Sequence, residues 1–169
     1  MYFWGPFYAY ATKVYNCDVS RPEKILWRWH ARFSHFKPAR PLEPQRFTGN
    51  ISGTTIFNDS YWGRLVLDSR SNNQWKENAF VFNFPSAACT ALLQNAGHMK
   101  QLLKPLVRDK PCAILPGVAV FNDQTLTQAY PNIPVLPYGE FRLRAMSNYV
   151  GISDPAACLA TDFVVNPRH

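Results

Sequence analysis

The sequence contains few charged residues and few glycines for its length. Charged residues make up 17% of the 169 positions, against about 25% in an average soluble domain, and the 8 glycines are outnumbered by 14 prolines. Each proline removes a backbone hydrogen-bond donor and fixes one dihedral angle, so this many excludes a mostly helical protein. Aromatic residues reach 15%, which argues against disorder. The composition therefore favours β structure with many turns.

Long hydrophobic runs are also missing. No stretch approaches the roughly 20 apolar residues that cross a bilayer, so the sequence predicts no membrane-spanning helix. The opening residues 1–7 (MYFWGPF) have neither a basic start nor an uninterrupted apolar core, and we expect a signal peptide to be removed from this chain or absent from it. The length suits a single domain over residues 1–169, with residues 1–8 as an aromatic N-terminal arm.

The familiar signatures of catalysis are absent from the sequence. There is no G-x-S-x-G motif, no glycine-rich phosphate loop and no C-x-x-C pair. The 11 carboxylates are scattered, without the close pair that a glycosidase needs. His30 and His35 are five positions apart on one expected strand, so they point to opposite faces and do not chelate one metal together. We therefore expect a protein that is not an enzyme and holds no metal.

The positive charge of the chain is not gathered into a nucleic-acid arm. The 18 Lys and Arg residues outweigh the acidic ones to give a net charge of +7, but they are spread along the chain. Nucleic-acid binding favours basic residues on one face with stacking aromatics nearby. Only the stretch with Arg28, Arg32, Lys37 and Arg40 approaches that pattern, and we interpret it as a solvated basic face.

The cysteines and two sequons point to an oxidising compartment. An even number of 4 widely spaced cysteines suits two disulfides. Asn50-Ile51-Ser52 and Asn58-Asp59-Ser60 are acceptor tripeptides for N-glycosylation. We predict glycan on Asn50 or Asn58, with Asn58 favoured because Asn-Asp suits a turn. The expected location is outside the cell or in the endo-lysosomal lumen.

Apolar and polar residues alternate over several segments that are separated by clusters of Pro, Gly, Asn and Asp. This period of two is typical of antiparallel strands with one buried face. In the clearest case, Trp27, Trp29 and Phe33 occupy odd positions, while Arg28 and Arg32 occupy even ones. The expected strands cover residues 25–36, 46–57, 61–71, 75–84, 118–121, 140–149 and 158–165.

The apolar period changes to that of a helix after residue 85. Between residues 86 and 106, apolar side chains recur at spacings of three and four, the stripe of an amphipathic helix. Ser86 suits the N-cap position, and Gly97 predicts a bend or frayed turn. We therefore predict a mainly β fold, an immunoglobulin-like β-sandwich or β-cup of seven to nine antiparallel strands with one inserted helix over about 86–106.

Large apolar side chains are concentrated on one face of the expected strands and on the helix stripe. A helix inserted into a sandwich can hold the sheets apart and leave a cavity for an apolar ligand. The competing interpretation is a fully packed core, because apolar faces usually pack against one another. The residues expected to line a cavity are Trp27, Trp29, Phe33, Leu65, Leu67, Phe80, Phe82, Leu92, Met99, Leu103, Phe141 and Leu143.

Two segments in the second half of the chain resemble a known family. Residues 110–118 (KPCAILPGV) and 133–143 (IPVLPYGEFRL) are similar to the C-P-x-x-x-G-x-Y … L-P-x-x-x-P-x-G-x-Y-R segment of the ganglioside-activator-like branch of the ML (lipid-recognition) β-sandwich proteins. An early cysteine, the sequence DSYW at 59–62, an SNNQW turn and later cysteines follow in the family's order. The likeness covers roughly residues 8–165 and is closest to secreted insect members of uncertain function.

The resemblance also bears on the disulfides, for which four cysteines allow three pairings. We predict Cys17–Cys158, because cysteines near the two ends suit terminal strands lying side by side, and Cys89–Cys112, which closes a local loop after the helix. The resembling family ties its termini and its helix in the same way.

The resemblance implies a cup that opens at one end to take acyl chains and has no catalytic residues. We therefore predict a non-enzymatic extracellular lipid-binding or lipid-transfer protein, whose only expected small-molecule component is a bound lipid or fatty acid. It would make transient contact with membrane surfaces. The candidates for contact with a headgroup at the rim are Arg28, Arg64, Arg142 and Arg144.

Two alternatives to lipid binding remain open. In the first, the cavity is filled and the protein is a structural or interaction subunit of an extracellular assembly, with the aromatic segment 2–10 as a docking arm for a protein partner. In the second, the protein is a hydrolase whose site residues meet only in the fold.

Overall fold

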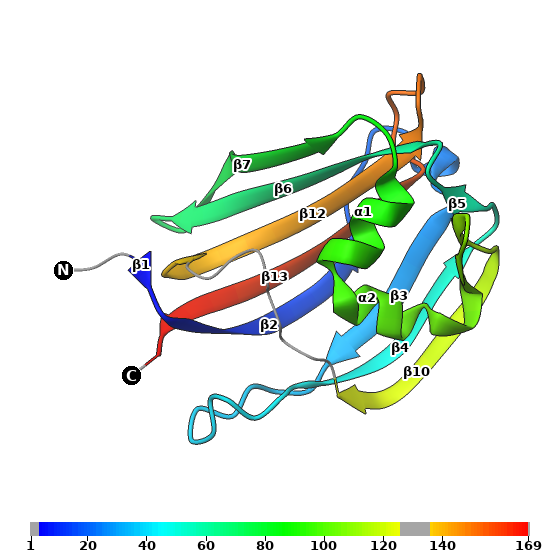
Figure 1. Ribbon diagram of the computed structural model, residues 1–169. Coiled ribbons are helices and arrows are strands. Elements are labelled where there is room, and N and C mark those ends of the chain that lie inside the picture. The colour runs from blue at the N-terminus through cyan, green and yellow to red at the C-terminus, as the bar shows by residue number, and fades with distance from the viewer. Residues whose placement is uncertain (1–3, 126–135, 169) are drawn as a thin grey trace.

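A computed structural model describes residues 4–125 and 136–168 of the chain (Figure 1). The longer strands are β2 (Phe7–Asn16), β3 (Trp27–Phe33), β4 (Arg46–Gly53), β6 (Tyr61–Ser71), β7 (Gln74–Phe84), β10 (Gly117–Thr125), β12 (Gly139–Tyr149) and β13 (Ala157–Pro167). The short strands are β1 (Trp4–Gly5), β5 (Phe57–Asn58), β8 (Val107–Asp109), β9 (Cys112–Ile114) and β11 (Leu136–Pro137). The helical elements are α1 (Ala88–Asn95), α2 (Gly97–Leu102) and the 3-10 turns η1 (Pro22–Lys24) and η2 (Lys104–Leu106).

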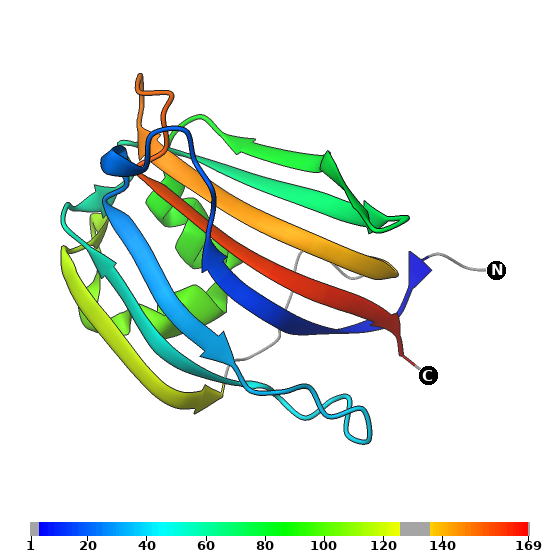
Figure 2. The same cartoon turned by 180° about the vertical axis from the view of Figure 1, so that it is seen from behind.

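The eight longer strands form one large twisted sheet. Its order is β10-β4-β3-β13-β12-β6-β7, and β2 also pairs with β13. Neighbours are antiparallel except β13 and β3, which meet in parallel at Ala157 and Trp27. Strands β5, β9 and β8 form a small second sheet, and β1 pairs with β11. Both helices lie on one face of the large sheet, in front of it in Figure 1 and behind it in Figure 2.

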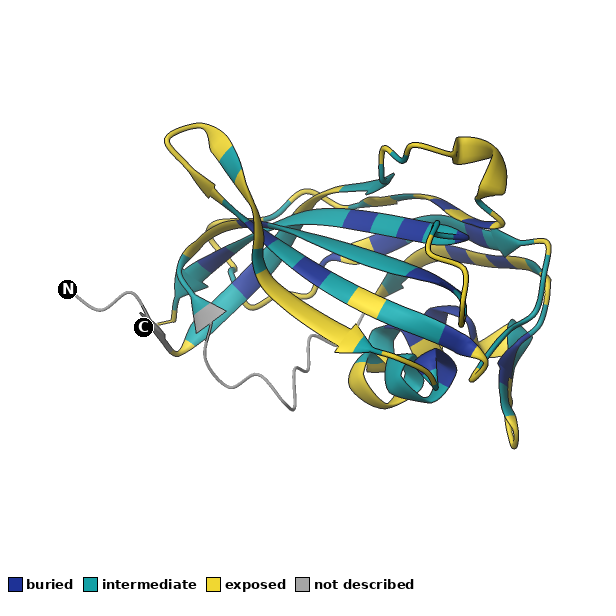
Figure 3. Cartoon of the chain, turned by 90° about the horizontal axis from the view of Figure 1, so that it is seen from above, coloured by how far each residue is buried: buried dark blue, intermediate teal, exposed yellow. Residues whose placement is uncertain are grey.

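Alternation along the strands gives the large sheet an inner face toward the helices and an outer face away from them. Figure 3 shows buried and exposed residues alternating along several strands. On β3, Trp27 and Trp29 are buried and pack in one cluster with helix residues, whereas Arg28 and His30, which alternate with them, are exposed. The predicted facing of this strand is therefore confirmed.

The mainly β fold class is confirmed, and most of the long strands lie where the alternation predicts them. β6 and β7 are joined by a tight turn at Asn72 and Asn73, whose positive φ angles of 52° and 60° suit the two-residue turns that match sheet twist. The expected seven to nine strands correspond to the eight long strands of the large sheet, and the described residues contain five further strands of two or three residues. Such short pairings leave no periodicity in the sequence.

The single predicted helix is divided in the structure. α1 ends at Asn95 and α2 begins at Gly97, with Ala96 between them at φ −127° and ψ 73°. The expected bend at Gly97 is therefore confirmed, but the Ser86 N-cap is wrong. The carboxylate of Asp59 instead accepts the Thr90 backbone N–H at 2.8 Å and the Thr90 hydroxyl at 2.6 Å, so a residue distant in sequence satisfies the first turn.

Both predicted disulfides are confirmed. Cys17 and Cys158 join the end of β2 to the start of β13, with their Cα atoms 5.3 Å apart. Cys89 and Cys112 join α1 to β9 over a Cα distance of 5.9 Å. Two bonded pairs indicate an oxidising environment, either extracellular or lumenal. Within the described residues, no helix is both long and apolar enough to span a membrane.

Part of the expected N-terminal arm belongs to the large sheet. Residues 1–3 lie outside the described residues, as do residues 126–135, which include part of the family-like segment 133–143. β2 begins at Phe7 and pairs along its length with β13, and Ala9 is buried. The arm is therefore wrong for residues 7–10, because alternation in a terminal segment does not show which strand it will join.

Candidate functional site

The inner face of the large sheet is covered by the helices over one half only. Strands β3, β4 and β10 form the packed half, and strands β7, β6 and β12 form the open half. The strand pairing shows that the two halves share the inner face. Trp27 of β3 is opposite Ala157 of β13, and Leu159, the next inward residue of β13, is opposite Ala145 of β12. In Figure 1 the helices stand before β13, β3 and β4, whereas long stretches of β7, β6 and β12 have no helix in front of them.

The packed half is a closed hydrophobic cluster. Phe47 and Ile51 of β4 are 1% and 2% exposed, and they pack with Phe121 of β10 and with Met99 and Leu103 of the helical segment. The Phe47 and Phe121 rings stack with centroids 4.7 Å apart. This half has the close packing expected of an ordinary core.

Glycine makes room for a large ring in the packed half. Trp27 lies opposite Gly53 on the neighbouring strand, and a Cβ atom added to Gly53 would overlap the indole ring. Gly117 continues the same row on β10. The close approach of backbone to ring therefore requires glycine at position 53.

The open half presents large apolar side chains that are not covered by the described residues. The register places them in two adjacent rows. Phe82 and Phe80 of β7 are 50% and 40% exposed, and the leucines beside them are only half-buried. We call this surface the open apolar patch. Its rows are Phe82-Leu65-Ala145 and Phe80-Leu67-Leu143.

The predicted cavity-lining residues divide between these regions. Trp27, Trp29, Met99 and Leu103 are buried in the packed cluster, with Phe33 and Leu92 against it. Phe141 is buried in a second small cluster at the far end of the open half. The residues that remain accessible on the inner face are Leu65, Leu67, Phe80, Phe82 and Leu143. The structure therefore brings the expected strands onto one face, while only the β7, β6 and β12 members stay open.

The four arginines expected at a cavity rim lie on the outer face. Arg28 is exposed there and donates to the backbone carbonyl of Pro22 at 3.1 Å. Arg64 alternates with the inward Leu65 and lines a shallow outer depression with Trp62. The rim assignment is therefore wrong, because period two places even-numbered arginines opposite to the inward odd positions of these strands.

Arg142 and Arg144 are held by a buried carboxylate. Asp68 is fully buried, and its Oδ2 accepts Arg142 Nε at 2.7 Å and Arg144 Nε at 2.8 Å. Its Oδ1 accepts Arg144 Nη2 at 2.9 Å and the backbone N–H of Asn78 at 2.9 Å. Asn78 has a φ of 58° at the irregular point of the β6–β7 register. The cluster therefore fixes the shape of β7 from the outer side.

The hydrogen bonds around Asp68 control its ionisation. Burial alone would raise the pKa of this carboxyl, but the bonds from Arg144, the Asn78 N–H and Arg142 outweigh burial, so the pKa of Asp68 lies below its usual value. The carboxylate is charged at neutral pH and is paired on both oxygens. These two arginines have side chains only 18% and 22% exposed, so they are committed to structure.

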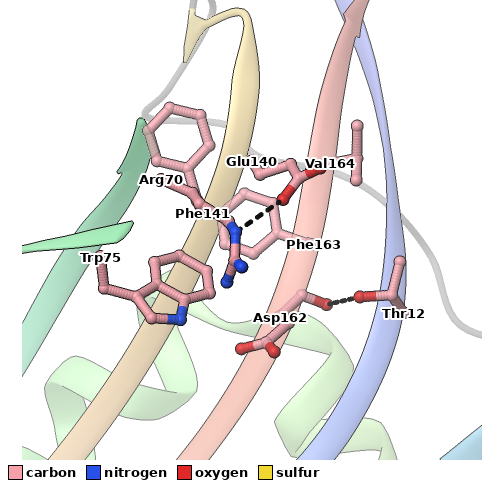
Figure 4. Close-up of a pocket in the computed structure, with 8 residues that line it drawn as sticks. All are labelled: Thr12, Arg70, Trp75, Glu140, Phe141, Asp162, Phe163 and Val164. Atoms are coloured by element: carbon pink, nitrogen blue, oxygen red, sulfur yellow. Dashed lines mark hydrogen bonds and ion pairs between the residues drawn. The ribbon is translucent and has the colours of Figure 1, made fainter. Parts of the chain in front are cut away.

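A small pocket of about 150 Å³ lies beside this cluster on the outer face (Figure 4). Figure 4 shows Trp75 on one side and Asp162 with Thr12 on the other, with the Arg70 guanidinium between them. The pocket is lined by Thr12, Arg70, Trp75, Glu140, Phe141, Asp162, Phe163 and Val164. Trp75, Arg70, Glu140 and Asp162 supply an aromatic ring and charges of both signs.

The groups of this outer pocket are already paired with one another. Arg70 Nε lies 3.7 Å from Glu140 Oε2, and its guanidinium lies 5.2 Å from the centroid of the Trp75 ring. The Arg142 guanidinium approaches the same ring at 4.8 Å. The pocket therefore offers a ligand little that is not already satisfied within the chain.

Tyr15 and Asp162 complete the polar network of the outer face. The Tyr15 hydroxyl donates to Asp162 Oδ1 at 2.7 Å. Burial, reinforced by this carboxylate, raises the pKa of Tyr15 to about 12. The phenol therefore stays neutral and acts as a donor throughout the physiological range.

The described residues offer one group of potential metal ligands. Asp59, Cys89 and Cys112 lie close together, but the two cysteines are joined to each other. Because zinc is bound by the free thiolate, this group does not form a cysteine metal site.

Sequence reasoning missed the Asp68 cluster and the exposure of the open half. Arg142 and Arg144 are 74 and 76 positions away from Asp68 in the sequence, so the three side chains meet only through strand pairing. The available signal was the alternation itself, since Asp68 follows Val66 on the face opposite to Leu65 and Leu67. A charged residue beside an apolar one on the same face of a strand suggests a paired group.

Comparison with known proteins adds no family assignment. A scan against protein-family models and a search of curated proteins both find no match to this chain.

Proposed function

We propose that the open apolar patch binds an acyl chain or a similar hydrophobic molecule, and that the protein is a non-enzymatic lipid-binding or lipid-transfer protein. The observation that carries the proposal is the exposure of Phe80 and Phe82, at 40% and 50%, beside half-buried leucines on the inner face. Exposed apolar patches of this kind on soluble proteins mark interaction sites. The likeness of residues 110–118 to ML proteins supports the same function.

The energetics suit a chain-like ligand. Burial gives about 0.8 kcal/mol per CH₂ group, so a sixteen-carbon chain gains roughly 12 kcal/mol before the cost of ordering it. The two rows of the patch contain no charged residue. Lys76 is on the same face, opposite Ser69 near the hairpin end of β7. It is therefore a better candidate than the four arginines for contact with an anionic headgroup.

The test is titration of lipid-stripped protein with an environment-sensitive hydrophobic dye, followed by displacement with palmitate. The double variant Phe80→Ala/Phe82→Ala removes the exposed rings of the patch, and we expect its affinity for the dye and for palmitate to fall at least tenfold. The matched control is Val118→Ala/Val120→Ala, which removes exposed apolar groups from the outer face of β10. The control should bind as the native protein does. Equal binding by all three proteins would refute the proposal.

The alternative of an extracellular assembly subunit has less support. Its docking arm was expected over residues 2–10, and Phe7–Tyr10 now belongs to β2 in the large sheet. The hydrolase alternative is not favoured by the Thr90 hydroxyl bonded to the Asp59 carboxylate, because that carboxylate also accepts the Thr90 backbone N–H and so holds the first turn of α1. Co-purification of a stoichiometric protein partner in place of lipid would favour the assembly subunit.

We also propose that the protein is secreted and glycosylated. The two disulfides support an oxidising compartment. Asn50 and Asn58 are both half-buried, and the Asn58 side chain accepts the backbone N–H of Ser60 at 2.9 Å in the expected turn. Protein secreted from insect cells should carry glycan on at least one site, Asn58 first. An intact mass equal to that of the bare chain would contradict this.

A further inference from the structure

Strand β7 is an edge strand with an unusually unprotected middle. It is the last strand at one side of the large sheet, and among the described strands it pairs with β6 alone. Figure 1 shows it along the margin of the sheet. The backbone N–H and C=O groups on the free side of an edge strand are a template for pairing with another strand. The residues around its centre are exposed on both faces, with Phe80 at 40%, Val81 at 37% and Phe82 at 50%.

The features that normally protect an edge flank this stretch but do not interrupt it. Lys76, Glu77 and the irregular Asn78 precede it, and Pro85 follows it. Between them, residues 79–84 (AFVFNF) carry no charge and no proline. Charges, bulges and prolines are the devices that block edge pairing, so residues 79–84 form a window that is open to a partner strand.

The opposite edge of the sheet differs. β10 also pairs with one described long strand, β4, and it exposes Val118 and Val120 on the outer face. Its inward residues Ala119 and Phe121 are 0% and 4% exposed, because the helical segment covers them. Of the two ends of the large sheet, as described over residues 4–125 and 136–168, β7 is the one that combines a free edge with uncovered aromatic rings on the inner face.

From this geometry we infer that β7 pairs antiparallel with β7 of a second copy of the chain, centred on Val81. In that register Val81 lies opposite Val81 of the second copy, and Phe80 lies opposite its Phe82. Cross-strand pairs of aromatic residues are among the favourable contacts of antiparallel sheets. The nearest charged residues, Lys76 and Glu77, fall opposite Ser86 and Pro85, so like charges do not meet.

A second copy suits this edge because the window is self-complementary. The same uncharged, alternating residues are presented by both copies, as a two-fold interface requires. The pairing keeps inner face beside inner face, since directly paired residues share a side of the sheet. Two open apolar patches would then form one continuous surface across the dimer. The inference stands on the edge alone and does not depend on lipid binding.

Charge-swap variants at Val81 test this register. Val81→Lys and Val81→Glu each place like charges opposite one another at the two-fold axis, which destabilises cross-strand pairing. Sedimentation velocity should show a dimer for the native protein, a monomer for each variant alone and a restored dimer for the equimolar mixture. We expect the dimer association constant to fall at least tenfold in the single variants. The matched control, Val120→Lys on β10, should stay dimeric.

Cysteine cross-linking provides a second test that does not require disruption of the edge. Directly opposed residues of antiparallel strands have Cα atoms about 4.5–5.5 Å apart, within the range that a disulfide spans. Val81→Cys should therefore form a covalent dimer on mild oxidation, whereas Val120→Cys should not. A monomeric native protein, an undiminished dimer of Val81→Lys, or equal cross-linking at positions 81 and 120 would overturn the inference.

Discussion

The packed and open halves of the inner face are built from similar strands but have different surroundings. Phe47 in the packed half is 1% exposed, whereas Phe82 in the open half is 50% exposed, although each points inward from a strand of the same sheet. The difference is the presence of the helical segment over one half. Coverage of the sheet by the helical segment, more than amino-acid composition, therefore decides which apolar residues stabilise the fold and which remain available for binding.

The open half is held in shape from its outer face. Asp68 binds Arg142 and Arg144 there, and Tyr15 binds Asp162. A paired, hydrogen-bonded network of this kind rigidifies a structure when all members are satisfied. Because the polar network on the outer face fixes the geometry of these strands, their inner face does not need to pack against another element.

The largest expected effect is a loss of stability on truncation of a side chain in the packed half. Phe47→Ala should lower the free energy of unfolding by about 3–5 kcal/mol, because it leaves a cavity in a closed cluster. Phe82→Ala, the matched change in the open half, should cost less than about 1 kcal/mol, since half of that side chain is already in water. Urea denaturation of the two variants measures both values. Similar losses for the two would contradict the division into halves.

Removal of the Asp68 carboxylate tests the support of the open half. Asp68→Ala leaves Arg142 and Arg144 without their buried partner, and we expect a loss of about 3–5 kcal/mol. The pKa of Asp68 is lower in the folded than in the unfolded chain, so its contribution is present above about pH 4 and is lost as pH falls through the folded pKa. The free energy of unfolding, measured by denaturation between pH 6 and pH 2, should fall more steeply with decreasing pH for the native protein than for Asp68→Asn. Parallel pH profiles for the two proteins would show that the Asp68 carboxylate is not the source of the pH-dependent stability.

Loss of the disulfide between Cys89 and Cys112 should weaken the packing of α1 over the packed half. Cys89→Ala/Cys112→Ala removes a cross-link over 23 positions, which the chain-entropy model values at about 3 kcal/mol. We also expect faster hydrogen exchange in α1 and increased dye binding, because the closed half would partly open. The matched control is the double alanine variant of Cys17 and Cys158, which destabilises the whole sheet without freeing α1 selectively. Unchanged exchange in α1 would contradict this account.

The smallest expected effect concerns His98 on α2. Burial lowers the pKa of His98, so the folded state favours the neutral imidazole. The associated stability is present above the unfolded pKa of about 6.5 and is lost as pH falls through the lower folded value. His98→Gln should therefore lose less stability than the native protein between pH 7 and pH 5. Thermal melting at the two pH values measures the difference.

Local patterns predicted much of the fold, because alternation and turn residues act over short distances. The inward facing of Trp27 and Trp29, the turn at Asn72 and Asn73 and the bend near Gly97 all follow from nearest neighbours in sequence. The disulfide pairs were also predicted, from the positions of Cys17 and Cys158 near the two ends and from the resemblance to a family that ties its termini and its helix in the same way.

The candidate site was predicted only in part, because it depends on which elements cover one another. The apolar stripe of β7 was evident, but the sequence gives no sign that the helices stop short of Phe80 and Phe82. The rim arginines were misplaced because Asp68, which binds Arg142 and Arg144, is distant in sequence. Strand pairing over such separations sets both features.

The proposed function of the open apolar patch is to hold a hydrophobic ligand. The most direct measurement is native mass spectrometry of the protein purified from its source, compared with the same sample after lipid extraction. The account predicts an added mass that corresponds to lipid, is removed by extraction, returns on incubation with lipid and fails to return in Phe80→Ala/Phe82→Ala. A source protein that carries no lipid and takes up none after incubation would contradict the claim.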